Sequence, residues 1–172
     1  MALIKSCRGF TPKNGNDCWF AENATIVGDV VMGDHCSVWF NAVIRGDVNS
    51  IVLGNKVNIQ DGAVLHATFE KTKTILGNNV SVGHNALVHG CTVEDNVLIG
   101  MGSIVMDNCY IESGSIIAAG AILTEGTRVA PGSIYAGVPA KKIKSISKEQ
   151  FEGEVMRIAN NYLKYSEWFK EE

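Results

Sequence analysis

Proline and charge are both scarce in this chain of 172 residues. Proline occurs 3 times against 18 glycines, so most turns must form without it. Charged residues make up 19% of the chain, and the net charge of −3 comes with no basic run in the body of the sequence. Nucleic acid is therefore not an expected partner. No stretch reaches the ~20 apolar residues that span a bilayer, so we expect no membrane segment.

Paired cysteine motifs are also absent. The five cysteines are odd in number and form no Cys-x-x-Cys pair, which argues against a zinc knuckle and a disulfide framework. Free thiols fit a reducing compartment. The segment from Met1 to Thr11 is too short and too polar for a signal peptide. We therefore expect a soluble protein that is made and kept in the cytoplasm.

A period of six residues runs through most of the chain. Every sixth position is large and nearly always aliphatic, as in the series Val93, Ile99, Val105, Ile111, Ile117, Leu123, Val129 and Tyr135. Four places after each large residue stands a small one, and the same pattern begins at Phe20. The register breaks in three places, which lie between Ile44 and Leu53, between Leu65 and Leu76, and between Val88 and Val93.

A six-residue period fits neither an α-helix nor a flat strand. It fits a short strand followed by a corner, with the aliphatic residue inside and glycine at the bends, and each unit buries its face only against its neighbours. The pattern resembles the hexapeptide-repeat, left-handed parallel β-helix. That resemblance predicts an all-β domain over residues 1–140, in which repeats from Phe20 to Ala140 form about seven triangular coils. The glycines expected at bends are Gly33, Gly54, Gly77, Gly83 and Gly100.

The pattern changes after Ala140. Ser147 followed three residues later by Gln150 is typical of a capping box. Apolar residues then recur at helical spacing, at Phe151, Val155, Ile158 and Tyr162. Residues 141–172 are therefore predicted to be a linker and a C-terminal amphipathic helix, from Ser147 to about Phe169, that lies along the prism.

The repeat assigns polar residues to faces, because three hexads per coil put every third unit in one column. Arg45, His66 and His89 share one column and should stack on one outer face, about 4.8 Å apart per coil. Asp61 and His84 share another column. His66 and His89 can therefore hold one metal ion together, whereas His84 lies on a different face.

One chain can hardly bring all three histidines to a single ion, but two chains side by side can. A contact between two different faces closes into a ring, and a threefold ring suits a triangular prism. We predict a homotrimer in which each metal is held by His66 and His89 of one chain and His84 of its neighbour. Three imidazoles leave an open position on zinc, where water has a pKa near ~7 and forms hydroxide. Iron, cobalt or nickel would also suit these ligands.

Several segments resemble the gamma-class carbonic anhydrase family. They are WFNAVIRGD at 39–47, NIQD at 58–61, LH at 65–66 and VGHNALVHG at 82–90. The resemblance covers most of the chain, and it implies that His66, His84 and His89 are the ligands of a zinc-type metal. It also implies a lyase that interconverts carbon dioxide and bicarbonate.

The same resemblance assigns further site residues. Arg45 and Asp47 match an arginine and an aspartate at the subunit contact. Gln60 matches the glutamine that orients the metal-bound water, and Asp61 matches an aspartate paired to arginine. Tyr162 falls in a stretch similar to one where some members place a tyrosine near the metal, although it also suits plain helix packing. Arg45 could pair with Asp61 across the contact or hold the anionic product.

Two departures from the family pattern concern proton transfer. Val48 stands where well-known active members carry a glutamate, and the loop from Ala67 to Thr74 is short, with Glu70 as its one acidic residue. The sequence thus resembles the shorter subclass without an acidic proton-shuttle loop. Because the metal-bound water must lose a proton each turn, we expect metal binding with weak turnover.

Other functions remain open at this stage. The fold is shared by acyltransferases that act on CoA esters with a histidine base and no metal, so it does not determine the activity. A metal hydroxide could also attack a thioester. A metal-binding scaffold without turnover is a further possibility.

Overall fold

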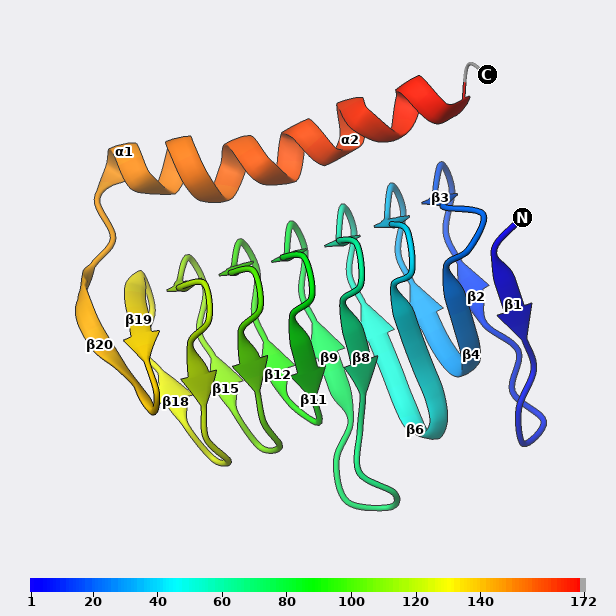
Figure 1. Cartoon of the computed structure of the whole chain (residues 1–172), viewed down its shortest axis with the longest axis horizontal. Coiled ribbons are helices and arrows are strands. Elements are labelled where there is room, and N and C mark those ends of the chain that lie inside the picture. The colour runs from blue at the N-terminus through cyan, green and yellow to red at the C-terminus, as the bar shows by residue number, and fades with distance from the viewer. Residues whose placement is uncertain (171–172) are drawn as a thin grey trace.

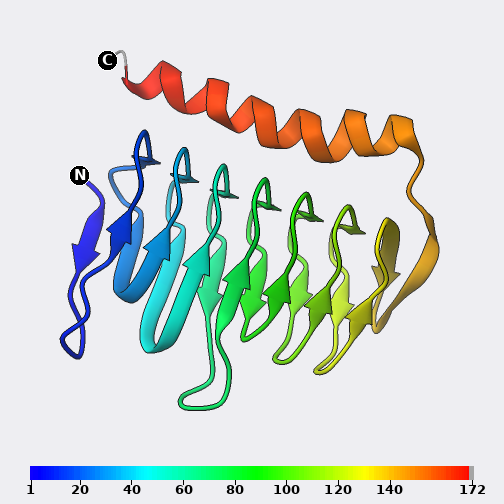
Figure 2. The same cartoon turned by 180° about the vertical axis from the view of Figure 1, so that it is seen from behind.

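The chain winds as a three-sided, left-handed parallel β-solenoid of about seven turns, with one helix lying alongside (Figures 1 and 2). The structure is a computed structural model and describes residues 1–170. Glu171 and Glu172, which close the predicted C-terminal segment, lie outside the described residues. The fold class predicted from the six-residue repeat is confirmed.

Short, mostly parallel strands line the three faces and form two hydrogen-bonded sheets. The first sheet covers two faces and contains β1 (Leu3–Lys5), β2 (Lys13–Asn14), β4 (Thr25–Met32), β6 (Val43–Leu53), β8 (Val64–His66), β9 (Thr74–Leu76), β11 (Leu87–His89), β12 (Thr92–Val93), β14 (Ile104–Val105), β15 (Tyr110–Ile111), β17 (Ile122–Leu123) and β18 (Arg128–Val129). The second covers the third face with β3 (Trp19–Phe20), β5 (Ser37–Val38), β7 (Asn58–Ile59), β10 (Ser81–Val82), β13 (Leu98–Ile99), β16 (Ile116–Ile117), β19 (Ser133–Gly137) and β20 (Ala140–Ser145). The long strand β6 joins two faces, because it pairs with β8 at one end and β9 at the other.

The aliphatic residue of each hexad points inward and stacks on its counterpart in the next coil. Ile44 pairs with Leu65, Leu65 pairs with Val88, and all three side chains are fully buried. Full burial of such a side chain stabilises the fold by about 1.5–3 kcal/mol. Cys36 and Cys109 fill small inward positions in the same core. The stacked core holds each face in a fixed register.

The glycines predicted at bends lie where the backbone of the next coil approaches too closely for a side chain, and their own backbone is not left-handed. A Cβ on Gly83 would lie only 2.7 Å from the backbone nitrogen of Met101 in the next coil. The left-handed corner positions include Asn41, at φ 59°, and Asn85, at φ 56°, and asparagine tolerates this region better than most residues. The sequence therefore predicted where these glycines lie, and their physical reason is the close approach of the next coil.

The stretch after Ala140, predicted as a linker, begins with strand β20. This strand folds back antiparallel onto β19, and Tyr135 pairs with Lys142. It lies at the edge of the second sheet, and its side chains after Ala140 are exposed. The hairpin therefore caps the last coil before the chain turns into the helix.

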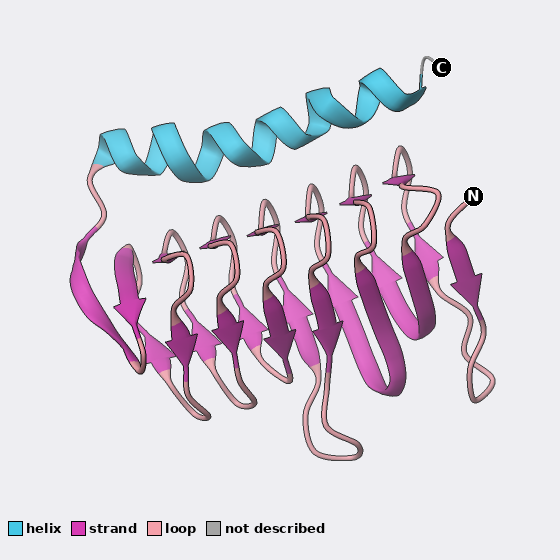
Figure 3. Cartoon of the chain, viewed as in Figure 1, coloured by secondary structure: helices cyan, strands magenta, loops and turns pink. Residues whose placement is uncertain are grey.

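The helix starts where the capping box predicts. The Ser147 side chain accepts a hydrogen bond from the Gln150 backbone, and the Gln150 side chain accepts one from the Ser147 backbone. The helix consists of α1 (Lys148–Gln150), the π-helical segment η1 (Phe151–Met156) and α2 (Arg157–Lys170). It runs back over the second sheet to the first coils (Figure 3), where the Phe169 and Trp19 ring centroids are 5.0 Å apart. Within residues 1–170, no helix is long and apolar enough to cross a membrane.

Candidate functional site

Two histidines meet on the first sheet, at the ends of neighbouring strands. His66 ends β8 and His89 ends β11, and the two residues are direct partners in the parallel register. His66 Nδ1 lies 3.1 Å from His89 Nε2. Because Ile44 pairs with Leu65, Arg45 stands one coil before His66. The predicted stacking of these three residues on one face is confirmed.

In both His66 and His89, the ring nitrogen that does not face the other histidine contacts a carboxylate. His66 Nε2 lies 3.1 Å from Asp47 Oδ1, and His89 Nδ1 lies 2.6 Å from Asp107 Oδ1. Histidines that bind metals almost always use their second ring nitrogen in this way, because the carboxylate sets the tautomer and the ring orientation. The pair therefore has the surroundings expected of metal ligands.

Burial and the charge of Arg45 both favour the neutral form of the His66 ring. Burial lowers the pKa of His66, and the nearby Arg45 guanidinium lowers it further. Arg45 donates to Asp47 Oδ2 at 2.6 Å within the same chain. Burial alone would raise the pKa of Asp47, but the hydrogen bonds from Arg45 and His66 outweigh it and lower that pKa. The carboxylate thus stays ionised beside a neutral imidazole, the form that can bind a metal.

His84 follows β10 on the second sheet, in a different column from the other two histidines. Ile59 pairs with Val82, so Asp61 and His84 follow in adjacent coils as predicted. His84 Nδ1 lies 2.9 Å from Asp61 Oδ2. The side chain of His84 is 41% exposed, the most open of the three. No three metal-ligating side chains of residues 1–170 gather at one point within the chain.

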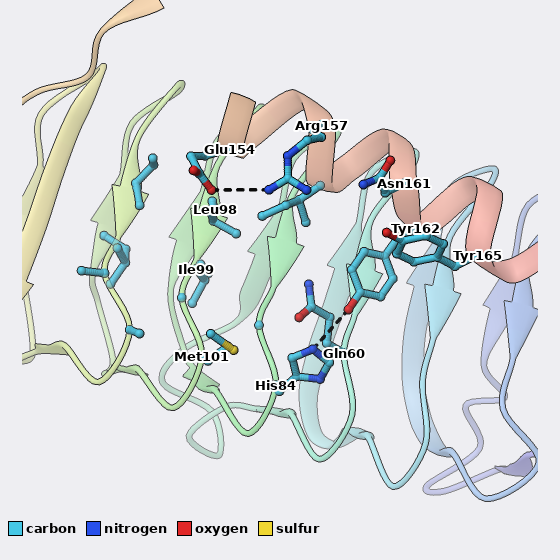
Figure 4. Close-up of a pocket in the computed structure, with 17 residues that line it drawn as sticks. Gln60, His84, Leu98, Ile99, Met101, Glu154, Arg157, Asn161, Tyr162 and Tyr165 are labelled. Atoms are coloured by element: carbon cyan, nitrogen blue, oxygen red, sulfur yellow. Dashed lines mark hydrogen bonds and ion pairs between the residues drawn. The ribbon is translucent and has the colours of Figure 1, made fainter. Parts of the chain in front are cut away.

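Gln60 and Asn58 form a buried polar ladder beside His84. Gln60 Nε2 donates to Asn58 Oδ1 at 3.0 Å, and Asn58 Nδ2 donates to Ser81 Oγ at 2.8 Å. Gln60 is only 4% exposed and lines the cavity next to His84 (Figure 4). Its amide is therefore held in one orientation, with its carbonyl oxygen free of that ladder.

Tyr162 both packs and reaches the candidate site. Its ring stands edge-on to Trp39, with centroids 5.0 Å apart. Its hydroxyl lies 3.3 Å from His84 Nε2 (Figure 4). Burial, with the nearby Asp61 carboxylate, raises the pKa of Tyr162 to about 12. The phenol is therefore protonated near neutral pH and can donate a hydrogen bond.

A cavity of about 360 Å³ lies between the helix and the second sheet (Figure 4). His84, Gln60 and Tyr162 border one part of it, and Glu154 and Arg157 border another. Between them the walls are mainly apolar, formed by Leu98, Ile99, Met101, Ile116, Ile117 and Ile158. The surroundings of His84 thus include an apolar chamber as well as polar groups.

Asp107 was not predicted as a site residue from the sequence. It stands 18 residues after His89, which is one full coil of three hexads, so the repeat itself could have placed it beside that ring. Thr68 and Thr72, whose hydroxyls contact the Asp107 carboxylate, were not predicted either. No signal in the repeat points to these threonines, because they lie in the insertion between two hexads.

A metal fits the observed donors. Zinc binds imidazole nitrogen at ~2.0–2.1 Å in a tetrahedron, so two such nitrogens lie about 3.3 Å apart on one ion. The facing nitrogens of His66 and His89 are 3.1 Å apart. His84 likewise has a carboxylate on one nitrogen, Nδ1, while its other nitrogen, Nε2, faces the Tyr162 hydroxyl. The three rings can hold a metal if a second chain brings its His84 to the pair.

Comparison with known proteins places the chain in a family. The family model described as bacterial transferase hexapeptide (six repeats) matches residues 15–46 and 90–125, so this is a hexapeptide-repeat protein. A carbonic anhydrase of Geobacillus kaustophilus is 41% identical over 98% of this chain and 91% of that relative. The "Probable carbonic anhydrase" of Methanocaldococcus jannaschii is 48% identical over 84% of this chain and 88% of its own. The chain belongs to the gamma-class carbonic anhydrase family.

A solved structure shows the same fold under a different description. A hexapeptide transferase family protein from Anaplasma phagocytophilum has a TM-score of 0.92 and is 38% identical. The alignment covers 97% of this chain and 98% of that one. Because transferases share the architecture, the residues of the site must decide the activity.

Proposed function

We propose that this protein is a metal-dependent carbonic anhydrase that interconverts carbon dioxide and bicarbonate at the subunit interfaces of a homotrimer. One observation carries the proposal, namely that each of the three family-matched histidines has a carboxylate on one ring nitrogen. The partners are Asp47, Asp61 and Asp107 for His66, His84 and His89, at 3.1, 2.9 and 2.6 Å. Three neutral imidazoles suit zinc, and also iron, cobalt or nickel.

The ligands would come from two chains. His66 and His89 of one subunit already face each other, and His84 of the next would complete the set. A bound metal supplies a hydroxide at neutral pH from its water. This trimer also explains why the His84 side chain is the most exposed of the three, since a ligand shared with a neighbour must lie at the surface of its own chain.

The other polar residues would orient the reactants. Gln60, fixed by Asn58, would hold a water molecule beside His84 through its free carbonyl oxygen. Tyr162 would donate from its hydroxyl on the same side. Arg45 carries the positive charge that an anionic bicarbonate requires, and Asp47 holds that guanidinium in place.

Proton removal would limit turnover. Val48 is apolar, and the loop from Ala67 to Thr74 offers only Glu70 as a carboxylate. Proton transfer by a positioned side chain contributes about 10²–10⁴-fold where it operates. We therefore propose that carbon dioxide hydration is slow and depends on buffer, which can carry the proton instead.

Thioester hydrolysis is a second candidate, and the cavity favours it. A chamber of about 360 Å³ is far larger than carbon dioxide and falls in the range of ~300–1,000 Å³ typical of sites for drug-sized ligands. An acyl chain could lie along Ile99 and Ile116 with its carbonyl near His84. An acyltransferase without a metal is less well supported, because it leaves the paired carboxylates of His66 and His89 unexplained.

A subunit-mixing experiment tests the shared site. His84→Ala and His89→Ala would each destroy every site in a trimer of one kind. In a mixed ring, one interface joins an intact His66–His89 pair to an intact His84. Mixing the two variants after unfolding and refolding should therefore restore metal binding. A mixture that stays metal-free contradicts the shared site, and a stable wild-type monomer with full metal content would do the same.

Activity is measured on the same samples. Stopped-flow carbon dioxide hydration should depend on bound metal and rise with buffer concentration, on protein prepared with and without oxygen. Hydrolysis of acyl thioesters of increasing chain length separates the second candidate. Protein that binds metal but performs neither reaction would support a scaffold. The five free cysteines fit our further proposal that the protein resides in the cytoplasm.

A further inference from the structure

The insertion between β8 and β9 interrupts the six-residue repeat directly after His66. It forms the long loop that hangs below the other turns (Figure 1). Two hydrogen bonds within the loop hold it, since Thr72 N donates to Thr68 O at 3.2 Å and Thr68 N donates to the Thr72 hydroxyl oxygen at 3.0 Å. Thr72 is only 6% exposed. This part of the loop is therefore ordered by hydrogen bonds and packed against the solenoid.

Thr68 and Thr72 hydrogen-bond to the Asp107 carboxylate, which in turn contacts the His89 ring. Thr68 Oγ1 donates to Asp107 Oδ2 at 2.5 Å, and Thr72 Oγ1 donates to Asp107 Oδ1 at 3.3 Å. Asp107 Oδ1 also faces His89 Nδ1 at 2.6 Å. With both oxygens engaged, the carboxylate cannot rotate without breaking a charge-assisted hydrogen bond, and such bonds are the stronger ones. The orientation of the His89 ring thus depends on the loop.

A third threonine at the end of the insertion ties the two histidine strands together. Thr74 is fully buried. Its hydroxyl donates to the carbonyl oxygen of His66 at 2.5 Å and accepts from the backbone nitrogen of Gly90 at 2.9 Å. Gly90 directly follows His89. The insertion therefore contacts the backbone beside both ring-bearing residues.

We propose that Thr68, Thr72 and Asp107 are positioning residues that hold the His89 imidazole in the tautomer and orientation needed to bind metal. The segment matched to the family's proton-shuttle loop would here shape the metal site. This inference rests on the proposed metal-binding function. Removing an outer-shell partner of a metal ligand typically costs 10–100-fold in metal affinity, so the effect is large enough to measure.

The test measures metal affinity on full-length, metal-free protein titrated with Zn²⁺ and Co²⁺ against a chromophoric chelator. Thr68→Val and Asp107→Asn should each weaken binding by about 10–100-fold and change the visible absorption of bound Co²⁺. Thr68→Ser keeps the hydroxyl and should retain the wild-type affinity and spectrum. Thr127→Val is the matched control, because within residues 1–170 the hydroxyl of this half-buried threonine bonds only to Thr124 in its own turn.

A double variant tests whether the two residues act through one path. If Thr68 acts only through Asp107, the combination Thr68→Val with Asp107→Asn should bind no more weakly than Asp107→Asn alone. Fully additive losses would overturn the proposed chain of contacts. Wild-type affinity and an unchanged Co²⁺ spectrum in Thr68→Val would overturn the role of the loop.

A second readout does not need the metal. In the metal-free protein, ¹⁵N chemical shifts of His89 should report one tautomer, with the proton on Nδ1 facing Asp107, and Thr68→Val should mix the two tautomers. If wild-type protein binds no metal, the proposed function fails, while this measurement still decides whether the loop positions the ring. A single unchanged tautomer in Thr68→Val would reject the inference even if metal binds.

Discussion

His66 Nδ1 lies 3.1 Å from His89 Nε2, although 23 residues separate them in the chain. The distance follows from strand register, because β8 and β11 are neighbours and the two histidines are direct partners. Asp47 and Asp107 approach the two rings from the opposite side. The pair is therefore arranged before any ligand arrives, which lowers the ordering cost of binding.

Metal removal should weaken folding and assembly together. A ligand present at a hundred times its dissociation constant stabilises the folded form by about 2.7 kcal/mol, and an ion shared between chains also joins them. Chelation should lower the unfolding temperature and make it depend more strongly on protein concentration. Calorimetry and light scattering measure the two effects. His35→Ala is the control, since within residues 1–170 the exposed imidazole of His35 makes only a 3.8 Å contact with Asp17, and the variant should respond to chelation as wild type does.

The Tyr162→Phe variant should distinguish the role of the Tyr162 hydroxyl from that of its ring. The variant keeps the contact with Trp39 and loses the group that faces His84. We expect stability to change by less than ~1 kcal/mol, while turnover falls by about fivefold, the equivalent of one lost hydrogen bond. Tyr162→Ala should instead cost about 1–3 kcal/mol of stability, because the half-buried ring is removed. Equal turnover in Tyr162→Phe and wild type would show that Tyr162 contributes to packing and not to turnover.

Cys18 should react with alkylating reagents at unusually low pH. The neighbouring Cys36 thiol is the main cause that lowers the pKa of Cys18 from 9.0 to about 7. The thiolate is the nucleophile. The rate of alkylation should therefore be low below pH 7, where the Cys18 thiol is protonated, and rise as the pH passes through 7. Cys36→Ala should move that midpoint back towards 9.0. Mass spectrometry identifies the labelled residue, and buried Cys91, whose pKa burial raises, should stay unlabelled.

Gly83→Ala should disturb both the coil and the adjacent histidine. The new Cβ would lie 2.7 Å from Met101 N and 2.8 Å from Ile99 O, and overpacking of this kind costs about 1–3 kcal/mol. Because His84 is the next residue, metal affinity should fall as well. Gly153→Ala is the matched control, because nothing lies within 4 Å of a Cβ there and alanine favours a helix by about 1 kcal/mol. Denaturant unfolding measures both variants, and a Gly83→Ala protein as stable as wild type would contradict the close-packing argument.

The six-residue repeat predicts much of the site because register alone decides which residues stack. The period of six residues is enough to predict that Arg45, His66 and His89 share one face and that His84 lies on another. Asp107 lies one coil beyond His89, so the same period predicts its place, although it lies outside the segments that resemble the family.

The insertion and the helix could not be predicted in the same way. The contacts of Thr68 and Thr72 depend on the path of an irregular loop, which has no period to read. The capping box predicts where the helix starts. Where the helix packs on the solenoid depends on contacts such as that between Trp19 and Phe169, which are far apart in the sequence. The proposed metal site would need a second chain, so the repeat could suggest it only through the placement of His66, His84 and His89 on two faces.

The helix that returns to the first coils changes how this solenoid folds. Repeat proteins usually fold by local, nearest-neighbour steps, yet here Phe169 packs on Trp19, Trp39 and Phe40. These aromatic rings cannot be covered until residues 148–170 have been synthesised. During synthesis the first coils therefore expose these aromatic rings until the helix has formed. Contacts between residues that are far apart in the sequence also slow folding. Completion of the fold is thus coupled to the synthesis of its last helix.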